Sequence, residues 1–541
     1  MGPVTVVRTA ARSAAAQQAD GWTDSFVWYA VAIREMKALS PRLDELRPFA
    51  LEANALRAKR NPTQADQQRY GQLLNAMLPI IRGWNDPRSL GYQAQVHDSF
   101  LPPGNWPTFG GADVLWHECA HANWFFLPWH RAYLLEFEAV CRAHVVRLGG
   151  PDDWALPYWN SSDYRTIPDA ASLPTALQDP ELPAGLELAT ESGQPDPDRT
   201  NPLFEPSRTG PPPLTPPASA DDWPDATAAL KRHHFANAED QQTISFGGGY
   251  VEDLTLFHFA GELGQVDAQP HGVGHSLTGG LMGAFSTAGL DPVFWMHHAN
   301  VDRLWETYAQ ELGHGYPFPN GRPGGPGLER DAYDSWASRE FRFLRPDGTV
   351  VTWKAPEVLE TEDLGYQYDT IAAPDFNVLT WQPTGQDVQP FGAAPRDFTP
   401  VAAAESVAIA DAATVVLTGG DPGETGSALV ADGTLWNVRF DGLRCEAPAQ
   451  TPYAVYLGLE GDEPDPTRLI GVLSLFGVFE ASIAADGSIG RSRLLEATGV
   501  VRALDGFDPF AARVTFVPSD ATRDLAAVGL VAERISLEVA G

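Results

Sequence analysis

The histidines of this chain are confined to its middle. All 13 lie between His97 and His314, and most fall in two clusters, His97–His130 and His271–His298. Histidine is the commonest transition-metal ligand among side chains, so two such clusters indicate a metal centre assembled from distant segments. The part of the chain after His314 has no histidine and contributes no imidazole to such a centre.

Length and composition limit the class of protein. A chain of 541 residues with 43% hydrophobic residues can form more than one domain with a large core. Its 37 Lys+Arg against 70 Asp+Glu give a net charge of -33, which repels nucleic acid and anionic membranes. We therefore expect neither nucleic acid nor a membrane as a partner.

The cysteines and the N-terminus bear on the compartment. Cys119, Cys141 and Cys445 are too few and too scattered for a disulfide framework, which favours a reducing environment. The first 20 residues lack the apolar core of a signal peptide, and no window approaches a membrane-spanning length. We expect a protein that is cytoplasmic or exported without a classical signal peptide.

The first part of the chain has helical periodicity. Apolar residues recur at helical spacing in 26–38, 131–148 and 293–312, which predicts a mainly helical domain. Between about 166 and 225 the composition shifts to Pro, Asp, Ser and Gly, and the run GPPPLTPPASADD cannot continue a helix or a central strand. We interpret this Pro-rich insertion as a surface excursion between the two histidine clusters.

After residue 340 the pattern changes to short alternating segments. Strands are predicted at 435–440, 453–459, 473–476, 514–517 and 535–539. Alternation with turn residues between the segments indicates an antiparallel β-sandwich or barrel. We therefore predict a multidomain chain, with a helical domain at 1–382, a linker at 383–400 and a β-rich domain at 401–541.

The first cluster contains two histidines held close to a predicted helix start. His121 and His130 are nine residues apart in HANWFFLPWHRAYLLEFE, and Pro128 precedes the helix that His130 is expected to open. The proline restrains the backbone and Trp129 supplies an apolar wall. An imidazole at His130 would therefore be held in one orientation, as a metal ligand requires.

The second cluster begins with an H-x-x-x-H pair. His271 and His275 would lie on one face of a helix, about one turn apart and able to bind one ion, although Gly272 and Gly274 weaken the helix prediction. Further on, DPVFWMHHANVDRLW offers His297 or His298. Imidazole ligands suit copper, zinc, iron or nickel, and the spacing alone does not choose among these metals.

Two long motifs resolve that choice by resemblance. The strings HANWFFLPWHRAYLLEFE and GGLMGAFSTAGLDPVFWMHHANVDRLW resemble the two copper-binding signatures of the tyrosinase, catechol oxidase and haemocyanin family, in the same order. The resemblance runs from about residue 5, at VVRTAARS, to about residue 370, at DLGYQYD. It implies a dinuclear type-3 copper centre in a helical domain with a four-helix-bundle core, with O2 as co-substrate.

The same resemblance implies a set of ligands. The first copper would be held by His97, His121 and His130, and the second by His271, His275 and His298. His117 competes with His97, and the family's upstream position for the first ligand favours His97. The spacing to Asp302 selects His298 over His297, which becomes a packed neighbour. Asp302 itself could orient this region through hydrogen bonds.

Cys119 stands two residues before His121, as C-x-H. In fungal tyrosinases and molluscan haemocyanins a cysteine at this position is joined to the histidine by a thioether bond. The resemblance therefore implies a Cys119 to His121 crosslink, and the alternative is a buried free thiol.

Four further residues are candidates for catalysis. A phenol stays protonated near neutral pH, so its oxidation needs a base. Glu262 matches the bacterial position of that base, and Asp267 lies nearer the plant and fungal position. Gly272 stands where many strong monophenol hydroxylases have asparagine, and cannot orient a water molecule. Phe285 matches a gate residue over the second copper.

The resemblance thus implies a polyphenol oxidase that converts o-diphenols to o-quinones, with weak or variable monophenol hydroxylation. The C-terminal domain is expected to cover the active-site mouth and keep the enzyme latent until it is removed, by means of an apolar or aromatic plug that the sequence does not identify. The alternatives are a haemocyanin-like oxygen carrier and an o-aminophenol oxidase.

Overall fold

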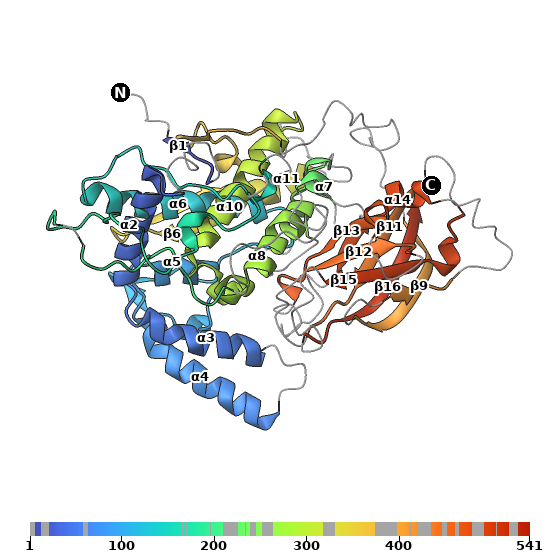
Figure 1. Ribbon diagram of the computed structural model, residues 1–541, viewed down its shortest axis with the longest axis horizontal. Coiled ribbons are helices and arrows are strands. Elements are labelled where there is room, and N and C mark those ends of the chain that lie inside the picture. The colour runs from blue at the N-terminus through green and yellow to red at the C-terminus, as the bar shows by residue number, and fades with distance from the viewer. Residues whose placement is uncertain are drawn as a thin grey trace.

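The chain folds into a helical part followed by a β-sheet part, which lie side by side (Figure 1). The computed structural model describes residues 6–11, 21–57, 63–163, 167, 170–194, 196–208, 226–232, 234–237, 245–251, 263–316, 330–373, 398–409, 414–419, 434–445, 452–459, 465–478, 492–504, 506–518 and 528–540. The predicted linker at 383–400 lies almost wholly outside these residues. Among the described helices, none has the length and apolar character needed to cross a membrane.

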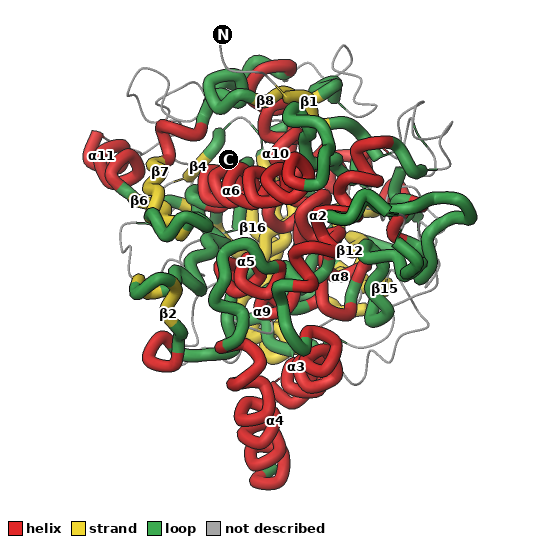
Figure 2. The backbone as a smooth tube through the Cα atoms, turned by 90° about the vertical axis from the view of Figure 1, so that its left-hand side faces the viewer, coloured by secondary structure: helices red, strands yellow, loops and turns green. Residues whose placement is uncertain are grey.

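The helical part is arranged around one long buried helix. Its helices are α2 (Asp24–Ala38), α3 (Leu43–Arg57), α4 (Gln64–Arg82), α5 (Leu90–His97), α6 (Phe126–Arg147), α7 (Thr227–Leu230), α8 (Val273–Thr278), α9 (Phe285–Ala288), α10 (Pro292–Glu306) and α11 (Arg330–Ser338), with π-helical turns η6 (Asp267–Gly272) and η8 (Thr307–Glu311). α6 packs against α2 and α10 in the centre, and α3 and α4 pair at one end (Figure 2). Its short strands are β1 (Val6–Arg8), β2 (Thr108–Phe109), β3 (Ala112–Asp113), β4 (Ala236–Asn237), β5 (Gly248–Gly249), β6 (Glu340–Leu344), β7 (Val350–Lys354) and β8 (Tyr366–Tyr368).

Local sequence explains where the central helices begin. Asp291 caps α10 by accepting a hydrogen bond from the Val293 amide at 2.9 Å, and Pro292 fits the first helical position because no N–H is needed there. α6 begins at Phe126, so Pro128 lies in its first turn and His130 in its second. The prediction that His130 opens this helix was therefore wrong, because a proline in the first turn does not delay a helix start.

A buried network of charges joins the two ends of the helical part. β1 and β8 pair in parallel, and the Arg8 guanidinium donates to Glu138 at 2.9 Å and to Asp302 at 3.2 Å. The hydroxyls of Tyr366 and Tyr368 each donate to Asp302 at 2.6 Å. Asp302 therefore anchors α10, which carries His298, to both strands and to Arg131, in keeping with the expectation that it orients this region through hydrogen bonds.

The Pro-rich insertion is more buried than its composition suggests. Within its described residues, apolar side chains belong to the main hydrophobic core, namely Leu173, Ala176, Leu177, Leu182, Leu188 and Leu203. The expectation of a purely surface excursion was therefore wrong for this stretch, because its spaced leucines are buried even without regular secondary structure.

The C-terminal part consists of two four-stranded antiparallel sheets. Their strands are β9 (Thr399–Ala408), β10 (Thr414–Val416), β11 (Leu435–Asp441), β12 (Tyr453–Leu457), β13 (Leu469–Leu473), β14 (Arg493–Glu496), β15 (Arg513–Pro518) and β16 (Val531–Ala540), with the short helix α14 (Thr498–Ala503). The strand orders are β10-β15-β12-β13 and β14-β11-β16-β9. Both sheets contribute to one core, in which Phe440 meets Phe516 edge to face. The prediction of a helical part followed by an antiparallel β-domain is confirmed.

One predicted strand of this domain is wrong. β13 ends at Leu473, and residues 474–478 leave the sheet and turn, with Gly477 at a φ of 79°. The alternation in this stretch arises because Leu475 is buried in the β-domain core, whereas Phe476 is buried against the helical part. Because these residues are buried in two different cores, their sequence pattern resembled that of a single strand.

The Arg8 network gives a stability prediction. Arg8→Met leaves the buried carboxylates of Glu138 and Asp302 without this partner, which should lower the free energy of unfolding by about 3–5 kcal/mol. The measurement is urea unfolding followed by near-ultraviolet circular dichroism. Arg42→Met, which removes an exposed pair with Glu45, is the control and should change the free energy of unfolding far less, because solvent screens that pair. Equal effects of the two substitutions would contradict the proposed role of the network.

Candidate metal centre

Six histidines from segments far apart in the sequence meet in one buried site. They are His97 at the end of α5, His121 in the loop before α6, His130 on α6, His271 on η6, His275 on α8 and His298 on α10. Each side chain is at most 3% exposed. Their possible ligand atoms form two groups, in each of which the atoms lie within 4.8 Å of one another, and the first group also includes Cys119. The first group contains His97, His121 and His130, and the second contains His271, His275 and His298.

Hydrogen bonds fix the orientation of most of these rings. The Nδ1 atoms bond to Phe285 O at 3.1 Å (His97), Asp267 Oδ1 at 3.3 Å (His121), Phe126 O at 2.7 Å (His130), Asp267 O at 3.0 Å (His271) and Met282 O at 2.9 Å (His275). An Nδ1 that faces an oxygen carries the proton, so Nε2 presents its lone pair to the interior. The backbone thereby selects the tautomer that binds a metal.

The Nε2 atoms then face one another at short range. His97 Nε2 lies 3.4 Å from His121 Nε2, and His275 Nε2 lies 3.3 Å from His298 Nε2. Burial lowers the pKa of His130, His275 and His298 well below the ordinary value, and neighbouring imidazoles lower it further, so these rings stay uncharged. His271 Nε2 is buried and has no hydrogen-bond partner among the described residues. Converging lone pairs without protons fit a cation in each group.

Asp267 connects the two groups. Its carboxylate lies 3.3 Å from His121 Nδ1 and 3.1 Å from His271 Nδ1, and it also accepts the Ala122 amide at 2.9 Å. Burial alone would raise the pKa of Asp267, but the two histidines outweigh burial and hold the pKa well below its usual range. Since its side chain is 2% exposed and bonds to several donors, it is a positioning residue. This geometry disfavours Asp267 as the base that receives a substrate proton.

His297 lies beside the site as a packing residue. Its Nε2 bonds to His271 O at 3.0 Å, so this ring helps to hold the backbone of a ligand candidate. A Cβ at Gly274 would lie 2.3 Å from the His297 ring. The glycine that weakens the helix prediction is therefore needed for this close contact.

Cys119 and His117 occupy different environments. Cys119 Sγ is buried 3.4 Å from His130 Nε2, and burial raises the pKa of its thiol. His117 has a positive φ of 58° and bonds through Nδ1 to Asp98, with 44% of its side chain exposed. The structure thus brings His97, rather than His117, together with His121 and His130.

The remaining predicted residues are only partly placed. Glu262 lies outside the described residues, so its role as a base stays a prediction. The Phe285 ring lies 5.6 Å from the His97 ring and 4.6 Å from the His121 ring, centroid to centroid. These contacts place Phe285 beside the first group, whereas the sequence suggested a gate over the second ion.

Phe476 of the β-domain is a site residue that the sequence did not identify. Its ring stacks on His275 with centroids 3.9 Å apart and planes at 14°, and it lies 4.5 Å from the Phe285 ring. Only 7% of its surface is exposed. The available signal was the pair Leu475-Phe476 followed by Gly477, which interrupts the alternation expected of a strand.

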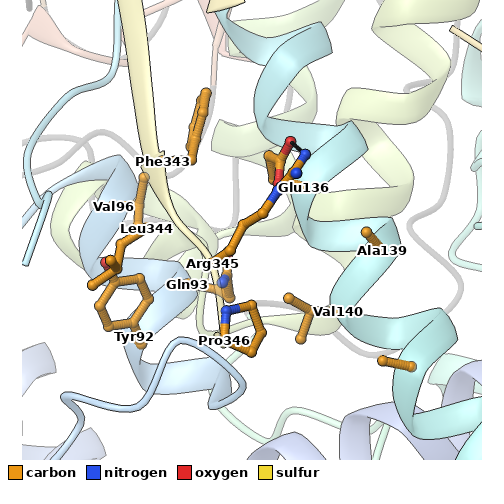
Figure 3. Close-up of a pocket in the computed structure, with 11 residues that line it drawn as sticks. Tyr92, Gln93, Val96, Glu136, Ala139, Val140, Phe343, Leu344, Arg345 and Pro346 are labelled. Carbon is orange, nitrogen blue, oxygen red and sulfur yellow. Dashed lines mark hydrogen bonds and ion pairs between the residues drawn. The ribbon is translucent and has the colours of Figure 1, made fainter. Parts of the chain in front are cut away.

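A separate cavity lies beside α5 and α6, the helices that carry His97 and His130 (Figure 3). It has a volume of about 180 Å³ and is lined by α5, α6 and β6, including Val96, Val140 and Phe343. Its main charged pair, Arg345 and Glu136, is joined at 2.7 Å. None of the six histidines lines this cavity, so it is not part of the metal centre.

Comparisons with known proteins agree with a two-metal histidine site. Residues 87–311 match the family model described as the common central domain of tyrosinase. A tyrosinase of Hahella sp. (strain CCB-MM4) is 28% identical over 476 residues, covering 81% of this chain and 90% of that protein. A chloroplastic polyphenol oxidase of Malus domestica is 27% identical over 341 residues, covering 60% of this chain and 51% of that protein.

Solved structures support the fold across both parts. The structure of latent apple tyrosinase covers 100% of this chain and 98% of its own, with a TM-score of 0.52 and 19% identity. A recombinant latent aurone synthase covers 99% of this chain and 90% of its own, with a TM-score of 0.52 and 18% identity. At these identities the likeness shows the fold alone, a helical core followed by a β-domain.

The site defines a dinuclear metal protein with imidazole ligands. The chain contains a central domain of the tyrosinase family at residues 87–311, and the relatives it matches are tyrosinases and polyphenol oxidases. Members of this family are copper oxidoreductases that bind two copper ions, and the two histidine groups fit such a pair.

The ligand assignment can be tested by counting copper. His97→Ala should lower the copper bound per reconstituted chain from two ions to one, because it removes one of three imidazoles from the first group. His117→Ala should retain both ions, because that ring lies outside the group. The measurement is elemental analysis after dialysis against a weak chelator. Loss of copper from the His117 variant and not from the His97 variant would reverse the assignment.

Proposed function

We propose that the protein is a polyphenol oxidase that oxidises o-diphenols to o-quinones with O2. The observation that carries this proposal is the pair of facing imidazole groups in a site enclosed by aromatic rings. In this proposal His97, His121 and His130 hold the first copper, and His271, His275 and His298 hold the second. α5, α6, α8 and α10 would then be the four-helix bundle that the family resemblance implies.

The chain's own residues prepare this site for oxidation. When bound, the two copper ions supply the redox chemistry that O2 and the substrate require. Asp267 fixes His121 and His271 together, and the ring of Phe285 excludes water from the space beside His97 and His121. Two catechols together lose four protons and four electrons, which balances the reduction of one O2 to two water molecules.

Gly272 favours catechols over monophenols in this proposal. Hydroxylation of a monophenol needs a base to take its phenolic proton, and Glu262 is the candidate whose water would need orienting. Gly272 has no side chain with which to orient that water. We therefore expect catechol oxidation to be faster than tyrosine hydroxylation.

The β-domain is proposed to keep the enzyme latent through Phe476. This ring stacks on His275 and contacts Phe285, in the space that an aromatic substrate would need. A substrate and the docked Phe476 cannot occupy that space together. Removal of the domain, or movement of the loop 474–478, would open the site.

The proposed activity is tested with copper-loaded protein. Catechol oxidation should be slow in the intact chain and rise after limited proteolysis between the two parts. Phe476→Ala should raise the activity of the intact chain at least about tenfold, which corresponds to 1.4 kcal/mol of lost closure. Leu475→Ala, in the adjacent core position, is the control for general loosening of the β-domain.

The same assay separates the alternatives. Reversible O2 binding without catechol turnover, even after proteolysis, would indicate an oxygen carrier. A strong preference for an o-aminophenol over the catechol would indicate an o-aminophenol oxidase. Brisk tyrosine hydroxylation would contradict the argument from Gly272.

We also propose a thioether bond between Cys119 and His121. Its formation removes one hydrogen from the Cys119 thiol and one from a ring carbon of His121, and O2 would take up the two protons and two electrons as hydrogen peroxide. Mass spectrometry of copper-loaded, O2-exposed protein should find the peptide of these residues lighter by two hydrogen atoms and resistant to thiol alkylation. Cys141, which is buried on α6, is the control and should stay a free thiol. An unchanged peptide mass after turnover would exclude the crosslink.

A further inference from the structure

Gly272 touches the covering domain as well as the metal centre. It follows His271 directly, and a Cβ built on it would lie 2.4 Å from Ser474 Oγ and 3.3 Å from Phe476 Cβ. Contacts below 3.0 Å do not occur without a shift of one partner. The backbone of Gly272 is helical, at φ -62° and ψ -29°, so its conformation does not itself require glycine. The shortest of these contacts is with the loop that carries Phe476, whereas the carbonyl oxygen of Asp267 would lie 3.2 Å from the same Cβ.

This loop is fixed from its other side by Arg493. The buried guanidinium donates to Ser474 O at 3.2 Å through Nε and to Phe476 O at 3.1 Å through Nη2. The Ser474 hydroxyl, in turn, accepts the Phe476 amide at 3.4 Å. Moving Ser474 away from residue 272 would weaken these bonds in a region where the groups have no water to replace them.

Apolar contacts continue the same interface. Val273 and Leu277 of α8 pack with Val472 of β13 in one small cluster. α8 faces the sheet that contains β13 (Figure 1). The helix that carries His275 is therefore also the docking surface for the strand that leads into the plug loop.

We propose that Gly272 is the docking residue of a latch, and that Arg493 holds the matching loop in position. A side chain at position 272 and the docked Ser474-Phe476 loop exclude each other. The proposal rests on the function proposed above, because it concerns closure of the same site. It follows that position 272, argued above to favour catechols, also sets the latency of this enzyme, because a larger side chain there would clash with the docked loop.

The test uses the full-length, copper-loaded chain with two substitutions. One introduces a steric clash at residue 272, and the other removes the atom that residue 272 clashes with. The quantity measured is the activation ratio, defined as catechol oxidase activity after limited proteolysis divided by activity before it. Gly272→Ala should lower this ratio at least about fivefold, since overpacking a fitted contact costs about that factor or more. Gly272→Ala combined with Ser474→Gly should return the ratio toward that of the wild type, because the hydroxyl that the new methyl group meets is gone.

A second readout does not depend on copper or activity. Hydrogen exchange of the backbone amides at 474–478 in metal-free protein should be faster in Gly272→Ala and slow again in the double variant. Val478 N, which donates to Leu475 O at 3.1 Å, reports on this turn directly. Arg493→Met should speed the same amides, and Arg468→Met, which removes a bond to Gly458 O instead, should not.

Gly71→Ala is the matched glycine control, because a Cβ there meets nothing within 4 Å. An activation ratio and exchange rates for Gly272→Ala equal to those of Gly71→Ala would overturn the latch. The latch would also be overturned if the double variant had the same activation ratio and exchange rates as Gly272→Ala alone. If cleaved wild-type protein does not oxidise catechol at all, the proposed function fails, but the exchange experiment still decides whether Gly272 controls docking.

Discussion

The structure depends on buried, uncharged imidazoles that face one another. His97 and His121 bring their Nε2 atoms to 3.4 Å, an arrangement that opposes lone pairs unless a cation lies among them. To hold it, the fold uses carbonyl oxygens at the ends and turns of short helices, such as those of Phe285 and Met282, as partners for Nδ1. These short elements therefore serve the site, since the carbonyl of Phe285, the first residue of α9, and that of Met282 each meet a ligand ring.

Two buried carboxylates stabilise the histidine arrangement, one next to the rings and one farther from them. Asp267 lies next to the rings and ties one group to the other through His121 and His271. Farther out, Asp302 accepts from Arg8 and Arg131 and holds α10, one turn beyond His298. Isolated carboxylates would be costly at either depth, but each one is surrounded by donors. Ligand positions thus depend on residues as distant in the sequence as the first strand.

Much of this could be predicted because the ligands lie in local motifs. Only His121 and His130, nine residues apart, and His271 and His275, four apart, are close in the sequence, so the resemblance is needed to add His97 and His298. Phe476 could not be found in this way, because period-two alternation does not show that Leu475 and Phe476 enter different cores. The helix start at Phe126 and the link through Asp267 also depend on packing that no local pattern records.

The position of the Phe476 ring also indicates which shape of molecule the open site can bind. Phe476 is nearly parallel to His275, at 14°, and its edge approaches the Phe285 ring at 4.5 Å between centroids. A flat aromatic ring fits this space, because offset stacking on an imidazole and a tilted contact with a second ring are both favourable. A phenolic substrate would keep these contacts and add an oxygen directed toward the imidazole groups. In the proposed function the plug and the substrate are selected by the same surfaces, which is how a domain without described histidines would control a histidine site.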